Sequence, residues 1–156
     1  MKFPVKVKYF LLIFLSVAVI LTGAYNIWNN NTIEVTNIEI SNLNIPEDFR
    51  NTTIVQVSDF HNSIFGKDQS KILDKLKETK PDLILITGDL IDRRNTKIDV
   101  AVSFVKEAIK IAPIYFVSGN HEILSGKYHI LKTKLSDEGV IILDNDSVIL
   151  KSGQST

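Results

Sequence analysis

The body of the chain alternates short apolar runs with helical patterns, and this alternation constrains its fold more than any other feature. Three runs rich in Val, Ile and Leu are typical of strands, at residues 53–57, 83–86 and 114–117. Between them, apolar residues recur at helical spacing over 67–79 and again after Asn95 or Thr96, either of which can cap a helix. Strands that alternate with helices pair in parallel, so the pattern predicts an α/β sandwich with a mostly parallel central sheet.

Further elements are expected on both sides of this core. Residues 33–40 are rich in β-branched side chains and predict a strand before the core. After the core we expect a helix over about 127–138 with Gly139 as its C-cap, a strand over 140–143, and a turn at 144–146 that leads into a strand over 147–150.

An uncharged apolar segment precedes the body. Residues 9–25 are long enough, at the short end, to cross a membrane, and Lys2, Lys6 and Lys8 come before them. We interpret residues 1–8 as a cytoplasmic basic segment, 9–25 as a transmembrane signal anchor, 26–52 as a tether with a first strand, and 53–156 as the folded body of the chain.

The positions of the basic residues predict an orientation for this anchor. The next basic residue after the apolar segment is Arg50, so the positive-inside rule favours a single-pass protein with its N-terminus in the cytoplasm and its body outside. Two alternatives remain: a cleaved signal peptide with a secreted product, although Thr22-Gly23-Ala24 is a poor cleavage site, and a buried helix of a soluble protein.

Composition excludes several kinds of function. The chain has no Cys, which excludes a disulfide framework, a thiolate zinc site and a cysteine nucleophile. Its 18 Lys and Arg balance its 18 Asp and Glu, so we expect no nucleic-acid partner.

Each of the three core strands ends in a compact polar cluster. The clusters are Asp59 with His61, Asp89 with Asp92, and Asn120 with His121 and Glu122. Right-handed connections bring the carboxyl ends of parallel strands to one edge of a sheet, where ligands of open α/β sheets bind. Carboxylate, imidazole and amide groups suit divalent ions such as Mn, Fe or Zn, so we expect a metal site at this edge.

Local features support the same interpretation. An extended backbone would place the side chains of Asp59 and His61 on one face. Gly88 leaves room for a ligand or another backbone beside Asp89, whose carboxylate can offer one oxygen to each of two cations.

Each motif alone also has an ordinary structural explanation. Asp89 suits a turn, Asn120-His121 a surface turn, and Asp92 a cap or loop. The sequence predicts Arg93-Arg94 and His129 to be solvated surface residues. Three clusters at three equivalent strand ends nevertheless favour a shared function.

The three motifs together resemble those of the calcineurin-like metallophosphoesterases. They read D-F-H at 59–61, G-D-L-I-D at 88–92 and G-N-H-E at 119–122, and the resemblance covers about residues 53–150. It is closer to bacterial membrane-anchored or exported members, part of which are described as similar to enzymes that cleave a UDP-linked lipid precursor. The resemblance implies hydrolysis of phosphodiesters or phosphomonoesters by two divalent ions (Mn, Fe, Zn or Co) outside the cytoplasmic membrane.

The resemblance also implies a role for each motif residue. Asp59 and His61 would bind the first metal, Asp89 would bridge both metals, and Asn120 would bind the second metal and a phosphate oxygen. His121 would be the catalytic residue, as a general acid or electrostatic stabiliser at the leaving oxygen. Gly88, Gly119 and Glu122 would support these residues.

The family pattern continues beyond what this chain contains. A later G-H motif and a final G-H-x-H motif supply three more histidines to the metals in the family, and neither occurs here. The resemblance therefore implies that residues 53–156 are the N-terminal part of a truncated metallophosphoesterase domain, which contains the βαβαβ half of the sandwich. We expect little or no activity from this chain alone.

Two other functions remain open from the sequence. One is a non-catalytic metal-binding remnant, and the other is an α/β binding protein whose motifs are coincidental. For an enzyme, the apolar anchor favours lipid-linked or cell-envelope phosphoesters as substrates.

Overall fold

A computed structural model describes residues 4–30 and 32–153, and for residues 26–30 it describes the backbone alone. The chain divides into two units, Met1–Asn37 and Ile38–Thr156. Lys2, one of the lysines of the predicted basic segment, lies outside the described residues.

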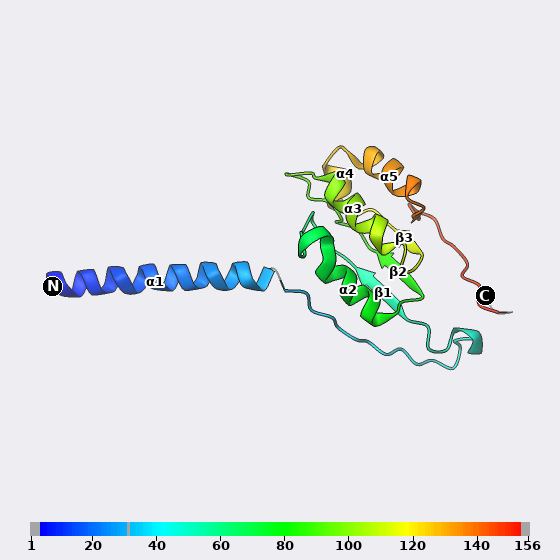
Figure 1. The fold of residues 1–156 in the computed structure, drawn as a ribbon, viewed down its shortest axis with the longest axis horizontal. Coiled ribbons are helices and arrows are strands. Elements are labelled where there is room, and N and C mark those ends of the chain that lie inside the picture. The colour runs from blue at the N-terminus through cyan, green and yellow to red at the C-terminus, as the bar shows by residue number, and fades with distance from the viewer. Residues whose placement is uncertain (1–3, 31, 154–156) are drawn as a thin grey trace. The chain divides into compact units, whose positions relative to one another are not determined.

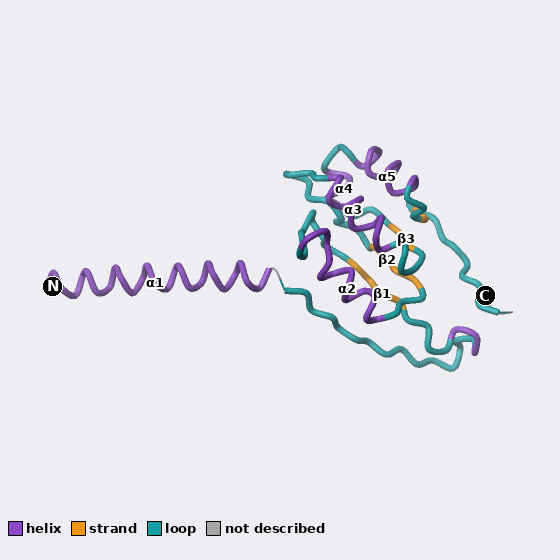
Figure 2. The backbone as a smooth tube through the Cα atoms, in the orientation of Figure 1, coloured by secondary structure: helices purple, strands orange, loops and turns teal. Residues whose placement is uncertain are grey.

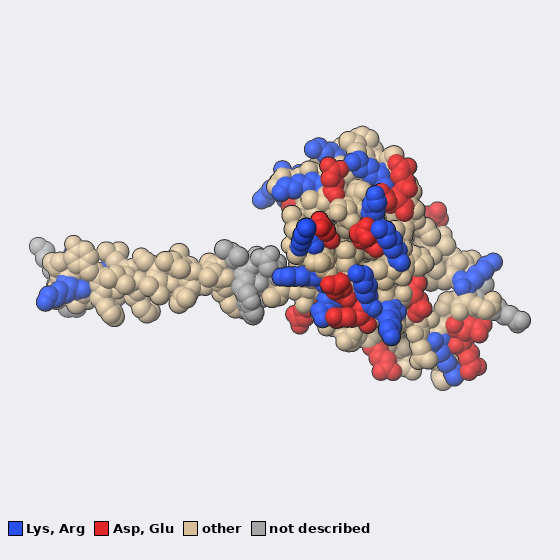
Figure 3. All heavy atoms as spheres, viewed as in Figure 1, with Lys and Arg blue, Asp and Glu red and all other residues tan. Residues whose placement is uncertain are grey.

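The first unit contains one long apolar helix, α1 (Val5–Asn30) (Figure 1). Within it, Val5–Tyr25 is long and apolar enough to cross a membrane, with a mean hydropathy of 2.2 and no buried part. Ser16 and Thr22 donate their hydroxyl hydrogens to carbonyls one turn earlier, which satisfies their polar groups inside the helix. The surface of the described helix is nearly free of charge apart from lysines near its start (Figure 3). The predicted apolar segment is therefore helical, and the helix extends beyond it at both ends.

The second unit is built on a parallel sheet of four strands, β1 (Ile54–Val57), β2 (Leu83–Ile86), β3 (Ile114–Phe116) and β4 (Ile141–Ile142). The strands lie in the order β1-β2-β3-β4, and all three pairings are parallel. This confirms the predicted α/β fold with three core strands.

Helices connect the strands: α2 (Ser70–Thr79), α3 (Ile98–Ala108), α4 (Asn120–Leu124) and α5 (Tyr128–Asp137). Short 3-10 turns cover Glu47–Phe49 (η1) and Lys67–Gln69 (η2). In a sheet of consecutive parallel strands, right-handed crossovers place every connection on the same face. Accordingly α3 contacts both α2 and α5, and Figures 1 and 2 show the three helices side by side.

The core lies between this helical layer and one face of the sheet. Ile84, Ile86, Ile114 and Phe116 are at most 1% exposed, as are Phe104 and Val105 of α3 and Leu131 and Leu135 of α5. Each such side chain contributes about 1.5–3 kcal/mol through burial, which holds the strand ends in fixed positions. Positive and negative side chains alternate over the face of this unit that Figure 3 shows.

Two predicted strands and one helix boundary are wrong. Residues 33–40 and 147–150 form no strand, because a strand needs a neighbour for its backbone hydrogen bonds and neither segment pairs with another described segment. The expected turn between 140–143 and 147–150 is present at Asp144 and Asn145. The helix predicted over 67–79 divides into η2 and α2, because Asp68 and Gln69 adopt left-handed backbone angles.

Candidate metal centre

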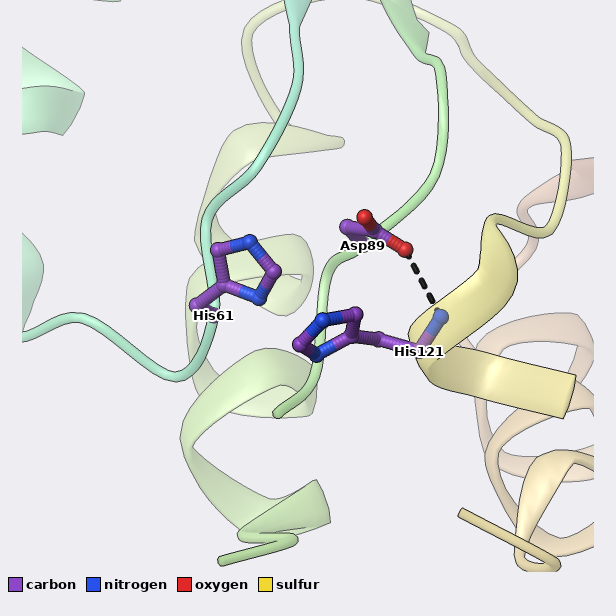
Figure 4. A group of neighbouring side chains, drawn as sticks. All are labelled: His61, Asp89 and His121. Atoms are coloured by element: carbon purple, nitrogen blue, oxygen red, sulfur yellow. Dashed lines mark hydrogen bonds between the residues drawn. The ribbon is translucent and has the colours of Figure 1, made fainter. Parts of the chain in front are cut away.

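Three side chains from three strand ends point toward one another at the carboxyl edge of the sheet. They are His61 after β1, Asp89 after β2 and His121 in α4 after β3 (Figure 4). One ligand atom from each lies within 4.8 Å of the others, and all three residues are half-buried. The convergence expected from the topology is therefore present.

The loop after β1 reaches the site through an unexpected backbone conformation. Asp59 and His61 have φ angles of 55° and 47°, so the extended backbone that we expected for this motif is wrong. Backbone N–H groups of Asp59, His61 and Asn62 bond to carbonyls of the loop after β2, which holds this left-handed path in place. His61 Nε2 still lies 3.5 Å from Asp59 Oδ1, so both side chains can bind the same ion.

The loops after β2 and β3 touch at two glycines. A Cβ on Gly119 would lie 2.2 Å from Asp89 Oδ1, and a Cβ on Gly88 would lie 2.6 Å from the backbone of Gly119. Gly88 also has a φ of 98°, which disfavours any other residue. Only glycine at both positions allows the Asp89 carboxylate to sit where it does, which supports the roles expected for Gly88 and Gly119.

Glu122 connects these two loops through hydrogen bonds to its carboxylate. Its side chain is fully buried, and its carboxylate accepts hydrogen bonds from the backbone N–H groups of Asp89 (2.7 Å), Gly119 (2.7 Å) and Ile91 (3.0 Å). A buried carboxylate needs such donors, and the donors in turn are fixed by it. Glu122 therefore fits the supporting role expected from the sequence.

His121 contacts both of its neighbours in the site. Its backbone N–H donates to Asp89 Oδ1 at 2.9 Å, the contact drawn in Figure 4. Its ring nitrogen Nδ1 accepts the backbone N–H of Arg93 at 3.2 Å and lies 3.6 Å from Asp92 Oδ2. The rings of His121 and His61 meet edge to face, with centroids 4.3 Å apart.

Asp92 combines a loop role with a contact that the sequence did not predict. Its Oδ1 accepts the backbone N–H groups of Arg94 and Asn95, both at 2.8 Å, which is the expected cap-like role. These hydrogen bonds lower the pKa of Asp92, with a smaller contribution from His121. Its other oxygen, Oδ2, faces His121. This contact depends on the tertiary path of the loop after β2, and no local sequence pattern indicates it.

The remaining candidates lie on the surface. Asn120 is exposed at the first residue of α4, directly before His121. The side chain of Asp59 is 69% exposed. Arg93, Arg94 and His129 are exposed, as the sequence predicts.

The close group fits a divalent cation. Ligand atoms about 2.0–2.2 Å from a common ion lie at most about 4.4 Å apart, so the observed spacing needs only small side-chain movements. Two imidazoles and a carboxylate suit Mn, Fe, Co or Zn. Two buried polar atoms, Nδ1 of His61 in the group and Oδ1 of the following residue Asn62, have no hydrogen-bond partner, which is unusual for a site that is complete without a further ligand.

Comparisons with known proteins agree with this chemistry. A family model described as calcineurin-like phosphoesterase matches residues 52–152. The chain is 26% identical to the uncharacterized metallophosphoesterase Cj0846 of Campylobacter jejuni, over 78% of this chain and 33% of that protein. It is 25% identical to the uncharacterized metallophosphoesterase YkoQ of Bacillus subtilis, over 80% of this chain and 47% of YkoQ. It is 41% identical to the uncharacterized metallophosphoesterase YkuE of the same organism, over 41% of this chain and 23% of YkuE. The chain thus spans less than half the length of each of these relatives.

Proposed function

The chain belongs to the calcineurin-like phosphoesterases, and from this premise we propose that its carboxyl-edge site holds two divalent ions that hydrolyse phosphoester bonds. The observation that carries the proposal is the convergence of His61, Asp89 and His121 within 4.8 Å. Asp59 and His61 would hold one ion, Asp89 would bridge, and Asn120 would complete the second site. Bound ions would activate a water molecule and neutralise charge on the phosphoryl group.

The contacts within the chain determine what its own residues do around such ions. The N–H of His121 fixes the rotation of the Asp89 carboxylate, and Glu122 fixes the backbone that carries Asp89. Because Nδ1 of His121 accepts the N–H of Arg93, a neutral ring carries its proton on Nε2. That N–H can donate a hydrogen bond to a leaving oxygen, which supports His121 as an electrostatic stabiliser there rather than as a third ligand.

The apolar helix supports a location and a substrate class. We infer a single-pass protein with its N-terminus in the cytoplasm and its site outside, or a secreted protein after signal cleavage. A site tethered to a membrane would meet lipid-linked or cell-envelope phosphoesters, so these are the proposed substrates.

A second candidate, a metal-binding protein without catalysis, is favoured by one observation. Among the residues that the structure describes, the close group offers one carboxylate and two imidazoles, which is enough to hold a single ion. Such a protein would bind an ion at the close group and hydrolyse nothing.

One pair of variants separates these candidates. The complete product of the gene is assayed with Mn²⁺ for hydrolysis of bis-p-nitrophenyl phosphate and p-nitrophenyl phosphate. We expect Asp89→Asn to lose both metal binding and hydrolysis, and His121→Ala to keep metal binding while hydrolysis falls about 10²–10³-fold, as for the loss of one stabilising donor. His129→Ala, on the exposed face of α5, is the matched control.

Each outcome of this assay supports one candidate. Metal binding with no hydrolysis in the wild type would favour the non-catalytic candidate. Hydrolysis that Asp89→Asn leaves unchanged would rule out this site as the catalytic one.

A further inference from the structure

A second polar cluster lies at the carboxyl end of β4, outside the candidate metal centre. Asp144 follows this strand, and Tyr128 and Lys132 lie in the first turns of α5. The Tyr128 hydroxyl lies 2.6 Å from Asp144 Oδ1 and bonds to the other oxygen as well, and Lys132 Nζ lies 2.9 Å from Oδ2. The cluster therefore ties the end of β4 to the start of α5.

The protonation states keep this pair together at neutral pH. Burial, followed by the hydrogen bond to Asp144, raises the pKa of Tyr128 well above its ordinary value. Burial also raises the pKa of Asp144, but the hydrogen bonds from Tyr128 and Lys132 lower it more, so the net shift is downward. Tyr128 thus remains a donor and Asp144 remains a charged acceptor.

The cluster reaches the loop that carries the metal-site residues after β3. The hydroxyl of Ser118 lies 3.4 Å from Asp144 Oδ1, and the ring of Tyr128 lies against that of Phe116, with centroids 6.5 Å apart. Ser118 directly precedes Gly119, so Tyr128 and Asp144 contact this loop on the β4 side. On the β2 side, the same loop is held by the bond from Gly119 N–H to Glu122 and the bond from His121 N–H to Asp89.

We propose that Tyr128 and Asp144 are positioning residues that hold Ser118–His121 in the geometry needed at the metal centre. The consequence for metal binding rests on the proposed function, but the effect on the loop does not. Without the pair, the loop loses its side-chain contacts on the β4 side and keeps there the backbone bond from Leu143 N–H to the Phe116 carbonyl. The two N–H groups that meet Glu122 and Asp89 then open more often.

Amide hydrogen exchange of the whole 156-residue chain in detergent micelles tests the effect on the loop. Replacing Tyr128 with Phe keeps the ring and removes only the hydroxyl. Loss of one hydrogen bond at the loop should raise the exchange rates of the Gly119 and His121 amides about fivefold. The amides of Ile84 and Thr87, which bond to the carbonyls of Pro113 and Val57 at the ends of the strand pairings, should keep their rates.

The proposal is tested by comparing the amide exchange rates at these four positions. Unchanged rates at Gly119 and His121 would overturn it, and so would an equal rise at all four amides, because that indicates general destabilisation. Tyr115→Phe, in the middle of β3, is the matched control and should leave all four rates unchanged.

Mn²⁺ titration then tests the consequence for the metal. Tyr128→Phe and Asp144→Asn should each weaken Mn²⁺ binding several-fold, whereas Asp146→Asn, an exposed position two residues further on, should not. Tight binding in the wild type with unaltered binding in both variants would overturn the link to the metal. Absence of Mn²⁺ binding in the wild type would count against the proposed metal centre, and the exchange pattern would still decide whether Tyr128 and Asp144 position the loop.

Discussion

Glu122 is the residue on which the geometry of the candidate site depends most. It is fully buried and accepts three backbone N–H groups from two loops. Glu122→Gln replaces one acceptor oxygen with a donor group, which leaves at least one buried N–H without a partner. We expect the variant to lose about 2–3 kcal/mol of unfolding free energy, measured by urea denaturation.

The matched control for this substitution is Glu78→Gln. Glu78 lies on the surface of α2, with its side chain 63% exposed and paired with Lys75. Such an exposed pair contributes about 0.5 kcal/mol or less. An equally small loss for Glu122→Gln would show that the buried carboxylate does not hold the two loops together.

Gly119 allows the loop after β3 to approach Asp89 closely, because it has no side chain. Gly119→Ala would place a methyl group 2.2 Å from Asp89 Oδ1, so the carboxylate or the loop must move. We expect a loss of about 1–3 kcal/mol of stability together with weaker Mn²⁺ binding. Gly126→Ala should cost about 1 kcal/mol for its positive φ and leave Mn²⁺ binding unchanged, because no atom lies within 4 Å of the added methyl. Mn²⁺ binding that is equal in the two variants would contradict the close approach.

At the scale of single residues, chemistry was easier to predict from the sequence than conformation. Residue types at the strand ends predicted that His61, Asp89 and His121 would converge. The left-handed backbone at Asp59 and His61 was not predictable, because tertiary bonds to the loop after β2 impose it. The contact between Asp92 and His121 was missed for the same reason.

At the scale of elements, the contacts of Asp144 with Tyr128 and Lys132, which connect β4 to α5, predict that stability depends on pH. The pKa of Asp144 is lowered in the folded chain, so its contribution to stability is present above the pKa of the unfolded chain and is lost as the pH falls through the lower, folded value. The difference in unfolding free energy between wild type and Asp144→Asn should therefore be large at pH 7 and shrink below about pH 4.

Urea denaturation at several pH values measures this difference. Asp146→Asn is the matched control, because Asp146 is exposed and accepts a hydrogen bond from the neighbouring Ser147 N–H. We expect the control to stay close to wild type throughout. A difference for Asp144→Asn that stays constant from pH 7 to pH 3 would contradict the assigned charge on Asp144.

Elements with buried faces were predicted well, and elements that depend on a partner were not. The runs at 83–86 and 114–117 form strands because both flank the core, where burial stabilises them. Residues 33–40 and 147–150 have the composition of strands but pair with no described segment. Composition indicates the propensity for a strand, whereas pairing depends on what lies beside it.

At the scale of the whole molecule, α1 predicts how the chain distributes between membrane and solution. Val5–Tyr25 contains 21 residues, and about 20 are enough to span a bilayer. We expect the full chain to stay with the membrane fraction after an alkaline wash, and a chain that begins at Asn26 to be found in the soluble fraction. Release of the full chain by the wash, without cleavage, would contradict an anchor.

We infer above all that the carboxyl edge of the sheet binds a divalent metal through His61 and Asp89, with His121 beside the ion. Mn²⁺ titration followed by electron paramagnetic resonance tests it directly, because bound Mn²⁺ loses the sharp signal of the free ion. We predict that the 156-residue chain in detergent removes this signal, that Asp89→Asn restores it, and that Asp146→Asn does not. A wild-type chain that leaves the free Mn²⁺ signal intact, or an Asp89→Asn variant that binds as well as wild type, would contradict the account.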